Sequence, residues 1–208
     1  MTRVLVVLAL AALAAASCFG DDDDQTTATS SPAAEVEASQ LPAHGEAIEP
    51  GWYTHEPFTP PVAVQVGEGW SAGHLNQEFW DVQRPNLLLG FARPDFLIDE
   101  NGEEVSVESM DAREALELLA ANAQLDPGEL GESVVAGNDA VVLELLPEAS
   151  TEILGGPSGR LMLEAGKPVR VIGLDVDGAP LFVVFLSLDE TTDGFEVAEE
   201  AVRTVRVG

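Results

Sequence analysis

The alternation of apolar and polar positions predicts several β-strands in the first half of the chain. Residues 62–66 alternate valine with small or polar side chains, which is typical of a strand with one buried face. Residues 86–91 form a continuous apolar run of strand length. Residues 96–107 place short apolar segments on either side of Asn101-Gly102, which favours a tight hairpin turn. These segments predict short strands connected by turns.

Helical spacing of apolar residues occurs at two places. After Asp111, apolar side chains recur every three or four positions, and Asp111 with Glu114 matches a capping box. Near the end of the chain, Asp193 and Glu196 repeat this pattern ahead of a second apolar stripe. The sequence therefore predicts two amphipathic helices, each with an aspartate at its N-cap.

The region between these helices returns to strand patterns. The strand-like segments are 133–136, 140–146, 160–164, 169–176 and 181–188. Asp177-Gly178 separates the last two and is typical of a hairpin turn. Tight turns between consecutive strands favour antiparallel pairing. We therefore expect an α+β fold, with a single twisted, mainly antiparallel sheet of about seven to nine strands and two helices packed on it.

The N-terminus predicts a bacterial signal peptide over residues 1–17. Arg3 precedes an uncharged apolar run that is too short for a membrane-spanning helix. Small residues then precede Cys18, an arrangement that resembles a lipobox, in which the cysteine carries the lipid. The alternative is an ordinary secretory signal and a secreted protein. Cys18 is the only cysteine, and a lone thiol beside a cleavage site is unusual in a secreted protein, which favours lipidation.

Residues 18–50 predict a lipidated N-terminus followed by an acidic, disordered tether. The segment contains many Asp, Ser, Thr, Ala, Glu and Pro residues and no Lys or Arg. Such a composition buries too little apolar surface to offset the entropy of ordering. Aromatic residues become frequent from Gly51 onward, so we expect a single α+β domain over 51–208.

The charge of the chain excludes one class of partner. The sequence contains 9 Lys+Arg and 37 Asp+Glu, for a formal net charge of −28. Nucleic-acid binding needs patches of Lys and Arg that neutralise phosphates, so we expect no nucleic-acid partner. Most of the acidic residues lie after residue 50, so the charge belongs mainly to the predicted domain rather than to the tether.

The sequence contains no recognisable catalytic or metal-binding motif. His44, His55 and His74 lack the spacing of zinc ligands. Residues 156–159 contain a serine between glycines but not the pattern of a nucleophile elbow, and we interpret them as a loop between strands. Residues 175–178 resemble the start of a calcium loop without its later ligands. We expect no cofactor, no metal site and no catalytic residue.

Trp52, Tyr53, Trp70 and Trp80 are the candidate ligand-binding residues. They include every tryptophan and the only tyrosine of the chain. Large rings with one polar end suit the wall of a concave ligand site. The alternative is that these rings pack in the core between the sheet and the segment that precedes it.

Several short segments resemble a group of small actinobacterial-type secreted lipoproteins of unassigned function. They are 51–53, 58–61, 69–70, 137–140, 170–178 and 195–207. The order of elements is also similar to the PsbP/Mog1-like α+β sandwich of mycobacterial-type lipoproteins. The resemblance implies a fold and an envelope location for 51–207, and it transfers no functional residue.

We therefore expect a non-enzymatic, lipid-anchored domain on the outer face of a bacterial cytoplasmic membrane. Its partners would be the membrane, through the N-terminal lipid, and a small apolar ligand or an envelope protein. The alternatives are an extracytoplasmic, hydrolase-like enzyme that uses acidic residues in a pocket, and a structural or sensor module. A convergent acid/base pair with perturbed pKa values in a cleft would favour the enzyme.

Overall fold

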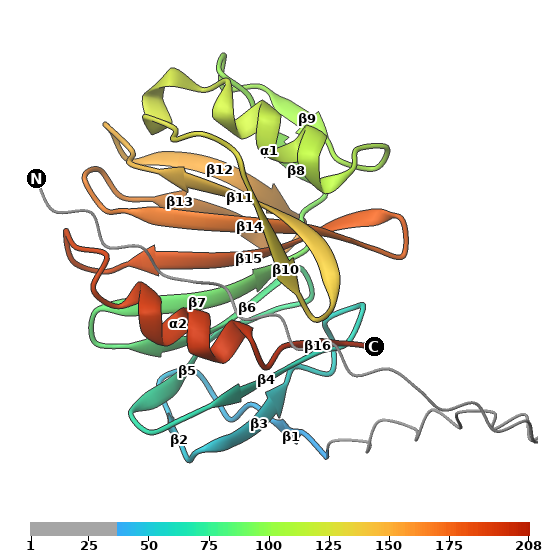
Figure 1. Cartoon of the computed structure of the whole chain (residues 1–208), viewed down its shortest axis with the longest axis vertical. Coiled ribbons are helices and arrows are strands. Elements are labelled where there is room, and N and C mark those ends of the chain that lie inside the picture. Colours follow the sequence, from blue (N-terminus) through green and yellow to red (C-terminus); the bar gives the residue numbers. More distant parts are fainter. Residues whose placement is uncertain (1–36) are drawn as a thin grey trace, which may run out of the picture. The chain divides into compact units, whose positions relative to one another are not determined.

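A computed structural model describes residues 37–208, which form sixteen strands, two α-helices and one 3₁₀-helix (Figure 1). The strands form three sheets, one of eight strands and two of four strands. The expected single sheet with packed helices is therefore wrong, because this part of the chain is mostly β and divides its strands among three sheets.

The eight-stranded central sheet has the order β10-β11-β14-β15-β7-β6-β5-β2. All its neighbouring strands are antiparallel, as the tight turns predict. Its strands are β2 (Ala47–Ile48), β5 (Trp70–Leu75), β6 (Phe79–Arg84), β7 (Leu87–Ala92), β10 (Gly131–Val135), β11 (Asn138–Leu145), β14 (Val169–Val176) and β15 (Ala179–Ser187).

The remaining elements cover the central sheet. One small sheet contains β1 (Ser39–Gln40), β3 (Gly51–Thr54), β4 (Val62–Val66) and β16 (Arg206–Val207). The other contains β8 (Phe96–Ile98), β9 (Glu104–Ser106), β12 (Thr151–Gly156) and β13 (Gly159–Leu163). The helices are α1 (Ala112–Ala120), η1 (Ala123–Leu125) and α2 (Phe195–Val202).

Both faces of the central sheet are buried, so each face needs a covering layer of other elements. In β15, Val183 and Phe185 belong to a first core with β4 and α2, whereas Phe182 and Val184 belong to a second core with α1, β8 and β12. Alternate side chains of one strand therefore enter different cores. Strands that are covered on both faces have continuous apolar sequences, as in 86–91.

Several local predictions are confirmed. Residues 62–66 form β4 and residues 169–176 form β14 with the predicted bounds. Asp177 and Gly178 join β14 to β15 with left-handed backbone φ angles of 53° and 77°, as a tight hairpin turn requires. The hairpin predicted around Asn101-Gly102 is formed by β8 and β9.

The segment before residue 51 contributes to the fold. β1 pairs with β3, β2 pairs with β5, and Leu41 and Ile48 are buried in the first core. Residues 39–50 are thus part of the folded unit, although their polar composition predicts a tether. Backbone pairing and two well-placed apolar side chains suffice here. The predicted signal peptide, 1–17, and Cys18 lie outside the described residues.

The two predicted capping boxes have different outcomes. At α1, the Asp111 carboxylate accepts a hydrogen bond from the Glu114 N–H at 2.8 Å, and Glu114 accepts one from the Asp111 N–H at 3.2 Å. The N-cap of α2 is Gly194, without any side-chain cap. The prediction that Asp193 caps α2 is therefore wrong.

This difference gives a matched pair of variants. We expect Asp111→Ala to lower the free energy of unfolding by about 1 kcal/mol, because a helix N–H loses its acceptor. Asp193→Ala should change it by less than about 0.5 kcal/mol, because no helix N–H depends on that side chain. Urea unfolding measures both, and equal losses in the two variants would contradict the assignment.

Candidate functional site

Trp70 and Trp80, two of the four candidate ligand-binding residues, lie in the central sheet and are core residues. Trp80 is completely buried, stacks on Phe91 at a centroid distance of 4.4 Å and meets Phe58 edge-on. Trp70 is buried below the guanidinium of Arg84, whose Cζ lies 5.6 Å from the ring centroid. Neither ring offers a free face to a ligand.

The other two predicted residues, Trp52 and Tyr53, are consecutive on β3, so their side chains point to opposite faces of the strand. Trp52 is half-buried, with the Cζ of Arg206 4.7 Å from its ring centroid. The Tyr53 hydroxyl donates a hydrogen bond to the backbone oxygen of Glu49 at 2.9 Å. Trp70 and Trp80 therefore belong to the first core and Tyr53 packs against it, whereas Trp52 is not part of it.

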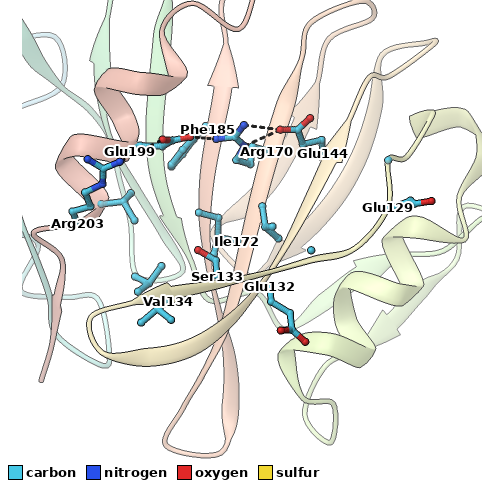
Figure 2. A pocket seen from close by; sticks show the side chains of 15 residues that line it. Glu129, Glu132, Ser133, Val134, Glu144, Arg170, Ile172, Phe185, Glu199 and Arg203 are labelled. Atoms are coloured by element: carbon cyan, nitrogen blue, oxygen red, sulfur yellow. Dashed lines mark hydrogen bonds and ion pairs between the residues drawn. The ribbon is translucent and has the colours of Figure 1, made fainter. Parts of the chain in front are cut away.

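A cleft of about 440 Å³, which we call the α2 cleft, lies between β10, β11 and α2 (Figure 2). Figure 2 shows Arg170 at one end of the lining side chains, with its guanidinium between Glu144 and Glu199. The same group lies over the rings of Phe185 and Phe195, with its Cζ 5.8 and 5.3 Å from their centroids. Arg170 already has partners, so its evident role is to attach α2 to the central sheet.

A second cavity of about 410 Å³ lies between the central sheet and the β12–β13 hairpin, and we call it the hairpin cavity. Its wall includes the apolar residues Phe79, Leu88, Leu154, Leu161, Met162 and Leu186. Leu88, Leu154 and Leu186 are also members of the second core. The hairpin cavity is therefore a place where the second core opens to the surface. None of the four predicted aromatic residues lines it or the α2 cleft.

Glycines on β12 let its neighbours approach closely: Gly156 faces Glu78 across the cavity, and Gly155 pairs with Phe96 of β8. A Cβ atom at Gly156 would lie 3.0 Å from Cγ of Glu78, and one at Gly155 would lie 2.8 Å from the ring of Phe96. The predicted loop at 156–159 is confirmed as the turn between β12 and β13, and the exposed Ser158 lines the cavity.

Most charged groups around the hairpin cavity are paired. The guanidinium of Arg160 forms ion pairs with Glu104 and Glu152, and Glu164 pairs with Lys167 at 2.6 Å. Glu78 differs, because its Oε2 atom is buried and has no hydrogen-bond partner among residues 37–208. The cavity thus combines an apolar wall with one unsatisfied carboxyl oxygen.

A histidine–aspartate pair lies at the rim of the same cavity. The Nδ1 atom of His74 lies 3.0 Å from Oδ2 of Asp81, which also accepts a hydrogen bond from the His74 N–H. Gln83 donates to the other oxygen of Asp81 at 2.8 Å. Asp81 is fully buried whereas the His74 side chain is 64% exposed. Burial raises the pKa of the Asp81 carboxyl above its ordinary value, although these hydrogen bonds act in the opposite direction.

Local backbone features position this pair. The pairing of β5 with β6 shifts register between Ala72 and Leu75, and such bulges re-aim side chains. A Cβ atom at Gly73 would lie 1.5 Å from Oδ1 of Asp81, so only glycine leaves room for the carboxyl group. A carboxylate on Nδ1 fixes the orientation of an imidazole and leaves Nε2 for other partners.

The three histidines have different surroundings. The ring of His44 lies against that of His74, with a centroid distance of 5.0 Å. His55 has a buried Nε2 atom, and burial lowers its pKa. Within residues 37–208, no group of three or more His, Cys, Asp or Glu side chains could hold a metal ion.

Sequence reasoning missed the polar residues of the hairpin cavity, Glu78 and His74, and the buried partner of His74, Asp81. All three are common residue types with no motif spacing, so nothing adjacent in the sequence marks them. One signal was present: Asp81 lies between Trp80 and Val82 in a strand, where an acidic residue is costly to bury.

No known family model and no curated protein matches the chain. The resemblance to PsbP/Mog1-like lipoproteins therefore stays a prediction. Among the helices within residues 37–208, none has the length and apolar character needed to cross a membrane.

Proposed function

We propose that the protein is a non-enzymatic, lipid-anchored domain on the outer face of a bacterial cytoplasmic membrane, where it binds a small apolar ligand. The hairpin cavity is the observation that carries the ligand part of this proposal. Its volume of about 410 Å³ lies within the range typical of small-molecule sites, roughly 300–1,000 Å³. Its apolar wall with a few polar groups also fits such a site.

Two further observations favour the hairpin cavity over the α2 cleft. Met162, on the cavity wall, is 54% exposed, and a ligand would cover this flexible apolar side chain. The Arg170 guanidinium in the α2 cleft is held by Glu144 and Glu199, so a ligand there would have to displace ion pairs.

Ester hydrolysis is the second candidate function, and the His74–Asp81 pair is the observation that favours it. The Nε2 atom of His74 would accept a proton from water while the water oxygen attacks an ester carbonyl carbon. The bond to the alcohol oxygen would then break, and the proton would pass to that oxygen, giving a carboxylic acid and an alcohol. We favour binding, because the apolar wall of the hairpin cavity suits a ligand directly, whereas the His74 side chain is 64% exposed and is not enclosed with a substrate.

Ligand binding in the hairpin cavity can be tested by filling its mouth. Ser158→Trp places an indole at an exposed turn position on the cavity wall, whereas Ser150→Trp adds the same group at an exposed position outside it. We expect Ser158→Trp to weaken binding of the neutral probe N-phenylnaphthylamine by at least about tenfold, with Ser150→Trp unchanged. Equal affinities in the two variants would count against this cavity as the site.

Catalysis can be tested with p-nitrophenyl decanoate. We expect the wild-type protein, His74→Ala and the neighbouring control His44→Ala to release nitrophenol at rates within about twofold of one another, because binding alone requires no proton transfer. A loss of about 100-fold in kcat/KM for His74→Ala alone would establish the hydrolase instead.

Lipid anchoring can be tested in a bacterial host that processes lipoproteins. We expect Cys18→Ser to move the protein from the membrane fraction to the soluble fraction, because the thiol that carries the lipid is lost. Unchanged membrane association of Cys18→Ser would refute the anchor.

A further inference from the structure

Hydrogen bonds fix the backbone of Glu78 beside the hairpin cavity. The Glu78 N–H donates to the side chain of Asn76 at 3.0 Å, and its backbone oxygen accepts from the Arg93 N–H at 2.8 Å. These bonds fix the backbone, and Gly156 permits the side chain to lie against the hairpin. The fold therefore places the Glu78 side chain between its own backbone and the hairpin.

The unsatisfied oxygen of Glu78 indicates what a ligand must provide. Its Oε2 atom is buried, and no donor within residues 37–208 reaches it. A buried acceptor without a donor is destabilising, and the cost disappears when a ligand supplies an N–H group. A positively charged donor gives the strongest hydrogen bond to a carboxyl oxygen.

The rest of the rim disfavours an anionic ligand. Arg160 is held between Glu104 and Glu152, so this cavity cation already has anionic partners. The formal net charge of −28 also attracts cations and repels anions at long range. The charge of the protein and the local chemistry of the cavity thus favour the same ligand class.

We propose that the ligand of the hairpin cavity is an amphiphilic primary amine, with an apolar body against the second core and an ammonium group on Glu78. This inference rests on the proposed binding function and adds the ligand class. A free alkylamine and the headgroup of a phosphatidylethanolamine share this chemistry.

Calorimetric titration of the full chain with three probes of equal chain length tests the inference. The probes are decylammonium, decanol and decanoate, and soluble dihexanoylphosphatidylethanolamine forms a fourth arm. We expect decylammonium to bind about tenfold more tightly than decanol, and decanoate to bind most weakly. Tighter binding of the phospholipid than of decylammonium would indicate that the ligand is a phosphatidylethanolamine. Weaker binding of the phospholipid would indicate that the ligand is a free alkylamine.

Two glutamates of the cavity provide the matched variants. Glu78→Gln should remove the preference for decylammonium, whereas Glu164→Gln should retain it, because Glu164 is exposed and paired with Lys167. The melting temperature of Glu78→Gln should be at least that of the wild type, since the negative charge on a carboxyl group with a buried, unpartnered oxygen is removed. Equal binding of decanol and decylammonium by the wild type would overturn the amine but leave the binding function intact. Failure of every probe to bind would overturn both.

Discussion

The central sheet is stable only if both of its apolar faces are covered, and the other elements pack on these two faces. Alternate side chains of β15, such as Phe182 and Val183, enter opposite cores. Phe182 and Phe185 have no exposed surface. Each face therefore needs its own covering layer, which β4 and α2 provide on one side and α1 with β8 and β12 on the other.

The hairpin cavity follows from how the second layer is built. The β12–β13 hairpin contributes buried side chains such as Ile153 and Leu163 to the second core. Beside the hairpin, Leu88 and Leu186 of the central sheet belong to the second core and also border an open space. The polar groups Glu78 and His74 border this space, so apolar and polar chemistry meet at a single opening.

Sequence patterns predicted the local elements well, because their signals lie in neighbouring residues. The bounds of β4 and β14 and the turn at Asp177-Gly178 are examples. The division into three sheets was missed because it depends on distant pairs, such as Leu97 of β8 with Leu154 of β12. The apolar run 86–91 contained a signal for two covered faces, but a buried helix segment gives a similar pattern.

The candidate site was less predictable than the fold. Trp80 and Trp70 were plausible ligand contacts, yet large rings lower the free energy most when they fill a core. His74 and Asp81 become a pair only through the bulge in β5 and the space left by Gly73. No spacing rule connects these features with the hairpin at Ser158, which lies far along the chain.

The most direct test of the account is methyl NMR spectroscopy of the protein during titration with an apolar amine. Ligand binding in the hairpin cavity predicts shift changes and ligand contacts at the methyl groups of Leu88, Leu161 and Met162. The methyl groups of Val134 and Val202 in the α2 cleft should keep their positions in the spectrum. Contacts confined to the α2 cleft, or no saturable change at Leu88 and Met162, would contradict the account.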